Sequence, residues 1–163
     1  MGNQMTAQAT TEIDADHSAF RELLDHKRVC DALYRYAETI DVKDFEGLRS
    51  VLTDDVVGLY NDYPRIDGAE ALVEWIRAAT DDRAWQHHKL TVYRVEVDGD
   101  TASAVTYHTS HQTRASDPDT VIVMVARYYD TLRRDGDRWL ISQKIMQTGW
   151  REERHAPQTR TTP

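Results

Sequence analysis

Hydrophobic periodicity changes near Trp85. Before this residue apolar side chains recur at helical spacing, whereas four later segments alternate as β-strands do, at about residues 87–99, 101–114, 120–134 and 137–150. Asp-Gly steps, which favour tight hairpin turns, join the first segment to the second and the third to the fourth. This order of elements predicts an α+β domain with a strongly curled antiparallel sheet.

Three helices are expected ahead of the sheet. The first carries an apolar stripe at spacings of four, three and four residues, formed by Val29, Leu33, Tyr36 and Ile40. Asp44 can cap a short second helix, and a third follows Gly68 after a short buried strand, VVGLY. Helices packed across one face of a curled sheet make a cone-shaped half-barrel with an internal cavity, which is a common place for a ligand.

The chain of 163 residues suits a single hydrophobic core. Residues 1–17 and 151–163 are polar and have no periodic apolar face. We therefore expect one domain over residues 18–150, preceded by a disordered segment and followed by a flexible tail.

Charge and composition exclude several classes of partner. The net charge is −8, with acids and bases interleaved, so nucleic acid would be repelled. A single cysteine, Cys30, excludes an internal disulfide framework and fits a reducing compartment. No stretch is long and apolar enough to span a membrane, and the N-terminus does not have the pattern of a signal peptide. A cytoplasmic protein without a membrane partner is predicted.

Candidate acid–base residues are dispersed along the chain. Asp41 ends the first helix, where the helix dipole disfavours a carboxylate by about 0.3–1 kcal/mol, so it either begins an exposed turn or has a specific partner. His87 and His88 are adjacent on a strand, so only one of them can enter the cavity. His108 and His111, three residues apart, cannot share a face of a regular strand either.

Five stretches of sequence, YAETIDVKDFEGLR, DVVGLY, QHH, YHTSHQ and DGDRW, occur in that order between about residues 25 and 150. Together they resemble the SnoaL-like branch of the nuclear-transport-factor-two-like superfamily, and within it scytalone dehydratase and related dehydratases. The resemblance implies a pocket enclosed by three helices and a curled sheet.

The resemblance also implies roles for four residues. Asp41 corresponds to the pocket aspartate, and Tyr60 to a tyrosine that polarises the substrate carbonyl through water. His88, ten residues before the DGD turn, and His111, in the His-Gln dipeptide, correspond to the paired catalytic histidines. The other two strand histidines, at positions 87 and 108, are then expected to point away from the pocket.

Other residues are candidates for substrate binding. The tyrosine that such dehydratases have directly before the aspartate is Ile40 here, and Tyr36 could take its place. Arg127 stands where the family has an asparagine, in an otherwise apolar strand. A buried guanidinium there should pair with an acid or anchor an anionic or carbonyl group. Three further residues either line the cavity or fill the core: Trp75, Tyr128 and Met146.

These features predict a cofactor-independent lyase that removes water from a cyclic or polyketide-like hydroxy-ketone. One histidine, supported by Asp41, would abstract the proton beside the carbonyl, Tyr60 would stabilise the enolate, and the other histidine would protonate the leaving hydroxyl. A 2-His-1-carboxylate metal site is disfavoured, because an HxxH spacing does not converge on a strand.

Two alternative functions stay open. An isomerase or polyketide cyclase would use the same base without loss of water. A non-catalytic domain that binds a small molecule would have no need for two imidazoles and a carboxylate in its pocket. In each case a homodimer or homotrimer is expected, because the outer face of the sheet would otherwise expose a large apolar patch.

Overall fold

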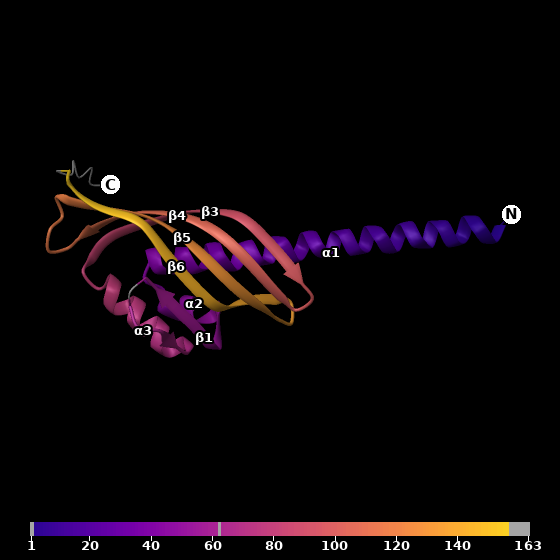
Figure 1. Ribbon diagram of the computed structural model, residues 1–163, viewed down its shortest axis with the longest axis horizontal. Coiled ribbons are helices and arrows are strands. Elements are labelled where there is room, and N and C mark those ends of the chain that lie inside the picture. The colour runs from indigo at the N-terminus through magenta and orange to yellow at the C-terminus, as the bar shows by residue number, and fades with distance from the viewer. Residues whose placement is uncertain (1, 62, 157–163) are drawn as a thin grey trace.

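A computed structural model describes residues 2–61 and 63–156, and in this part of the chain three helices pack against one six-stranded sheet (Figure 1). The helices are α1 (Gly2–Asp41), α2 (Phe45–Ser50) and α3 (Ala69–Thr80). The strands are β1 (Leu52–Tyr60), β2 (Ile66–Asp67), β3 (Arg83–Asp98), β4 (Thr101–Arg114), β5 (Thr120–Asp135) and β6 (Arg138–His155). The predicted α+β architecture is confirmed. None of the described helices is both long and apolar enough to cross a membrane.

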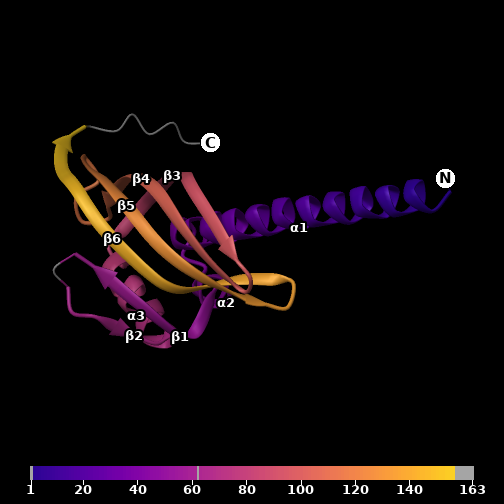
Figure 2. The same cartoon turned by 45° about the vertical axis from the view of Figure 1, so that its right-hand side comes forward.

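The sheet has the strand order β2-β1-β6-β5-β4-β3. The strands from β3 to β6 are antiparallel neighbours, as predicted, and Gly99 and Gly136 adopt positive φ angles of 57° and 59° in the two Asp-Gly turns. The sheet also includes β1, which pairs with β6 in parallel, and this pairing was not predicted. Figure 2 shows the long strands curling over α1, so the concave face of the sheet receives the helices.

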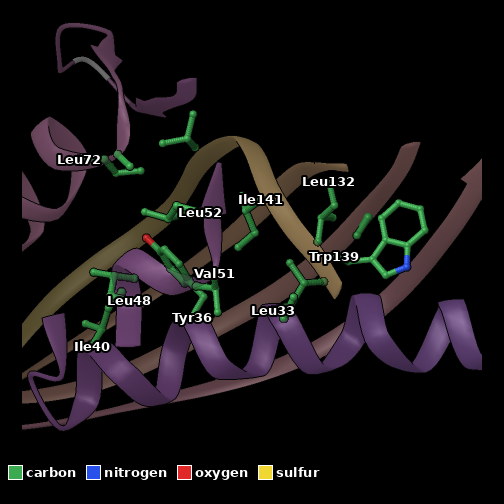
Figure 3. Packing of buried hydrophobic residues seen from close by; sticks show 14 of the residues in the cluster. Leu33, Tyr36, Ile40, Leu48, Val51, Leu52, Leu72, Leu132, Trp139 and Ile141 are labelled. Atoms are coloured by element: carbon green, nitrogen blue, oxygen red, sulfur yellow. The ribbon is translucent and has the colours of Figure 1, made fainter. Parts of the chain in front are cut away.

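The core forms between α1 and this concave face. Val29, Leu33, Tyr36 and Ile40 are each no more than 6% exposed, which confirms the predicted stripe. Figure 3 shows three of them, Leu33, Tyr36 and Ile40, on the side of α1 that faces the other buried residues of the cluster. The second helix is capped as predicted, since the Asp44 side chain accepts a hydrogen bond of 2.9 Å from the backbone N–H of Gly47.

Regular structure extends further at both ends than the sequence predicts. The helix α1 already begins at Gly2, and its N-terminal part projects beyond the sheet in Figures 1 and 2. Helix propagation adds one hydrogen bond per residue to a turn that packing has already nucleated, so a polar segment can continue it. Strand β6 continues to His155 because β5 offers it a partner as far as Thr120. The rest of the predicted tail, residues 157–163, lies outside the described residues.

Candidate active site

A cavity of about 160 Å³ lies between α1, α3 and the concave face of the sheet. Six predicted site residues contribute to its wall: Tyr36, Tyr60, Trp75, His88, Tyr128 and Met146. They come from six elements, because the curled sheet and the crossing helices bring distant segments to one point. The predicted pocket is therefore present, although three predicted residues, Asp41, His111 and Arg127, are not among those that line it.

Asp41 and His88 form a direct pair at this cavity. The His88 backbone N–H donates to Asp41 Oδ2 at 2.9 Å, and His88 Nδ1 contacts Asp41 Oδ1. Because a carboxylate only accepts hydrogen bonds, Nδ1 carries the proton, and the lone pair of the ring lies on Nε2. The two side chains are 19% and 9% exposed. This pairing explains a carboxylate at the C-terminal end of α1, where the helix dipole opposes it.

Tyr36 and Tyr60 form a second pair, with their hydroxyl oxygens 2.7 Å apart. Both side chains are buried, and burial raises the pKa of each phenol, so both remain protonated at neutral pH. Either hydroxyl can be the donor in this hydrogen bond. The Tyr60 ring also packs against Trp75 at 4.5 Å between centroids.

The histidine on β4 that shares the face of His88 is His108. Their rings stack at 4.9 Å between centroids, and His108 is only 1% exposed. Burial, followed by the nearby His88 and Lys144, lowers the pKa of His108 to about 3, so its ring stays neutral. Neither ring nitrogen of His108 has a hydrogen-bond partner among the described residues.

His111 lies on the opposite, outer face of the sheet. It is paired in register with His87, and the two rings stack at 6.5 Å. The expectations that His111 enters the cavity and that His108 points away are therefore wrong. The expectation that His87 points away is correct, because its side chain is exposed on the outer face.

Arg127 also lies outside the cavity. Its side chain is exposed on the outer face of the sheet, with the guanidinium carbon 5.0 Å from the centroid of the Tyr107 ring. The alternation of β5 puts Tyr128 inward, and therefore Arg127 outward. The apolar neighbours that seemed to bury Arg127 are divided between the two faces of the strand.

A buried ion pair behind the tyrosines was not predicted. Lys144 Nζ lies 2.8 Å from Asp130 Oδ1, and the two side chains are 1% and 0% exposed. The same ammonium group lies 4.2 Å from the ring centroid of Tyr36 and 4.1 Å from that of Tyr128. A fixed positive charge is thus held against the aromatic wall of the cavity.

A larger hollow elsewhere on the surface differs from this cavity in its lining residues. An open groove of about 1040 Å³ along β6 has no carboxylate or imidazole among its lining residues. Within residues 2–61 and 63–156, no group of three or more His, Cys, Asp or Glu side chains is placed to hold a metal ion. Of these two hollows, the smaller cavity is the one lined by a histidine that pairs with a carboxylate.

Comparison with known proteins agrees with this architecture. Residues 21–144 match the SnoaL-like domain family. The chain belongs to this family. One relative, the uncharacterized protein Rv2910c of Mycobacterium tuberculosis strain H37Rv, is 26% identical over 137 residues, which are 82% of this chain and 91% of the relative.

Solved structures share the fold at low sequence identity. Hexachlorocyclohexane dehydrochlorinase LinA-type3 from Novosphingobium barchaimii superposes with a TM-score of 0.75 at 15% identity, over 83% of this chain and 93% of that one. A protein from Novosphingobium aromaticivorans, provisionally named scytalone dehydratase, gives a TM-score of 0.75 at 14% identity, over 86% and 97% of the two chains. These similarities establish the fold common to nuclear-transport-factor-two-like proteins.

Proposed function

We propose that this SnoaL-like protein is a cofactor-independent lyase that removes water from a cyclic or polyketide-like hydroxy-ketone. The observation that carries the proposal is the pairing of Asp41 with His88 at a cavity that also contains the Tyr36–Tyr60 hydroxyl pair. A base and a hydrogen-bond donor in one enclosed space are what proton abstraction beside a carbonyl requires.

In this mechanism His88 is the base. Asp41 holds the ring in the tautomer that leaves Nε2 unprotonated, and its negative charge stabilises the imidazolium that forms. Nε2 takes the proton from the carbon next to the substrate carbonyl. His108 stays neutral, so its ring adds no positive charge beside His88.

Tyr60 is proposed to stabilise the enolate. If Tyr36 donates its hydroxyl hydrogen to the Tyr60 oxygen, the Tyr60 hydrogen is free to bond the substrate carbonyl oxygen. That hydrogen bond strengthens as negative charge develops on the oxygen. The buried Lys144 ammonium behind the rings adds a favourable field at the same place.

The same histidine can complete the elimination. The enolate re-forms the carbonyl as the neighbouring carbon–hydroxyl bond breaks, and the His88 imidazolium gives its proton to the departing hydroxyl. Water leaves, a carbon–carbon double bond remains and His88 is neutral again. This route needs one histidine, which fits the location of His111 on the outer face of the sheet.

Cavity size and structural neighbours add support. A cavity of about 160 Å³ is close to the roughly 150 Å³ that accommodates benzene, so a substrate portion of one six-membered ring fits it. The neighbours named above as a dehydrochlorinase and, provisionally, a dehydratase carry the names of elimination reactions.

The test is a panel of monocyclic hydroxy-ketones incubated with the protein and analysed by mass spectrometry. Loss of one water, abolished by Asp41→Asn and by His88→Gln, is expected. His111→Gln is the matched control and should react normally. A product of unchanged mass would indicate isomerisation instead of dehydration. Saturable binding without any product would favour the non-catalytic binding domain.

A further inference from the structure

Arg83, the first residue of β3, contributes to the wall of the same cavity. Its Nε donates a 2.7 Å hydrogen bond to Gln112 Oε1, and Gln112 Nε2 donates to the hydroxyl of the fully buried Ser110 at 3.2 Å. This chain of bonds fixes one edge of a half-buried guanidinium. The two terminal nitrogens of Arg83 make no hydrogen bond to any described residue.

The two carboxylates whose charges raise the pKa of Arg83 already have other hydrogen-bond partners. Asp82 accepts hydrogen bonds from the backbone and hydroxyl of Ser116, and Glu153 is paired with both Arg114 and Arg151. Within the described residues, Arg83 itself has no ion pair. Burial, followed by the charges of Arg114 and Arg151, lowers the pKa of Arg83, because both disfavour the positive charge of its guanidinium.

A cavity wall with an uncompensated guanidinium is unexpected in a chain of net charge −8. A half-buried cation is stabilised when a negative group completes its hydrogen bonds. We propose that Arg83 binds a carboxylate of the ligand, so that the substrate is a small cyclic hydroxy-ketone that carries a carboxylate rather than an uncharged one. This inference rests on the proposed function, because it names the substrate class of that site.

A carboxylate matches this site better than a phosphate does. The planar end of a guanidinium offers two parallel N–H donors at the spacing of two carboxylate oxygens. Phosphate sites commonly add backbone N–H groups from a glycine-rich loop or a helix N-terminus, and no glycine is among the residues that line the cavity. Arg83 supplies the only guanidinium among those residues, which suits a single negative charge.

Binding of benzoate and benzamide tests the inference without requiring turnover. The two probes share a ring of the size that the cavity accepts, and only benzoate carries a charge. Titrations followed by NMR should show benzoate binding to the parent protein about 10-fold or more tighter than benzamide, because hydrogen bonds to charged groups are the stronger ones. Arg83→Gln should remove this preference and leave benzamide binding unchanged.

Two further variants make the result specific. Gln112→Glu places a carboxylate beside Arg83 and should abolish the preference with the arginine still present. Arg127→Gln removes an exposed cation from the outer face of the sheet and should have no effect. Urea unfolding of each variant checks that the fold is intact.

The inference is overturned if the parent does not bind benzoate, if it binds both probes equally, or if Arg83→Gln keeps the preference. These results would leave the proposed lyase intact, since dehydration of neutral hydroxy-ketones would still be measurable. Conversely, the absence of turnover in every hydroxy-ketone tested would not alter the binding comparison. The two proposals can therefore fail separately.

Discussion

Replacing Lys144 by methionine should destabilise the protein in a pH-dependent way. The change retains the length of the side chain but removes the ammonium that lies 2.8 Å from Asp130, leaving a carboxyl group that is 0% exposed without its partner. Its other oxygen, Oδ2, already has no hydrogen-bond partner among the described residues. The variant must therefore either bury an unpaired charge or protonate Asp130.

Removal of one partner from a buried ion pair costs about 3–5 kcal/mol of unfolding free energy. With a urea dependence of about 2 kcal/mol/M, a loss of about 4 kcal/mol lowers the unfolding midpoint by about 2 M. Most domains have about 5–15 kcal/mol in total, so the variant should remain folded in dilute buffer. Urea unfolding followed by circular dichroism measures the shift.

The direction of the pH dependence follows from linkage. Burial already raises the pKa of Asp130 above the usual value of an aspartate, and the Lys144 charge that opposes this rise is lost in the variant. A carboxyl whose folded pKa lies above its unfolded value binds more protons in the folded state, so stability falls as pH rises through the folded pKa. The deficit against the parent should be larger at about pH 8 than at about pH 5.

The variant Asp130→Leu should show the opposite pH dependence of stability. Burial lowers the pKa of Lys144, and without Asp130 that lowering increases, so stability is lost as pH falls through the folded pKa. The double variant Lys144→Met/Asp130→Leu has no buried charge at this place and should recover most of the lost stability. Equal midpoints in parent and single variants, or deficits that do not change with pH, would refute the reasoning.

Three further predictions concern the site and the outer face. Tyr60→Phe should lower kcat about 10²–10³-fold with the fold intact, because one donor to the developing oxyanion is lost; an unchanged kcat would remove Tyr60 from the mechanism. Losses of kcat from Asp41→Asn and His88→Gln should not add in the double variant, since the residues act as a unit, and additive losses would indicate independent roles. We expect self-association through the outer sheet face, where Tyr93 is 66% and Tyr107 38% exposed. Light scattering should show a dimer or trimer that Tyr93→Asp dissociates, and a monomeric parent would contradict this.

The local sequence pattern predicted individual helices and hairpin turns better than it predicted which distant strands pair. The helical stripe of α1, the Asp44 cap and the two Asp-Gly hairpins depend on neighbouring residues, and all are present. The parallel pairing of β1 with β6 was missed, because the direction in which distant strands meet is not encoded in either strand alone. The resemblance to known dehydratases predicted that Asp41 and His88 share a pocket, and their direct pairing, which spans 47 residues of sequence, has no local signature.

The histidine error has a specific physical cause. Next to its turn the β3–β4 hairpin pairs Asp98 with Thr101 and Arg94 with Val105, and an unbroken continuation would pair His88 with His111. A bulge between Val92 and Arg94 shifts the register by one residue. Beyond the bulge, His88 is opposite Ser110, and His111 is opposite His87 on the other face. The bulge itself leaves no clear mark in the sequence.

A register shift also explains why the buried ion pair was not predicted. The β5–β6 hairpin pairs Asp135 with Arg138 and Leu132 with Ile141, and without interruption Asp130 would face Gln143. A shift between Thr131 and Leu132 brings Lys144 opposite Asp130 instead. Because side chains alternate between faces, one added residue decides whether a lysine is buried against a carboxylate or exposed to water. Both bulges lie between a hairpin turn and the cavity. The strand register next to each turn therefore differs from the register of the residues at the cavity.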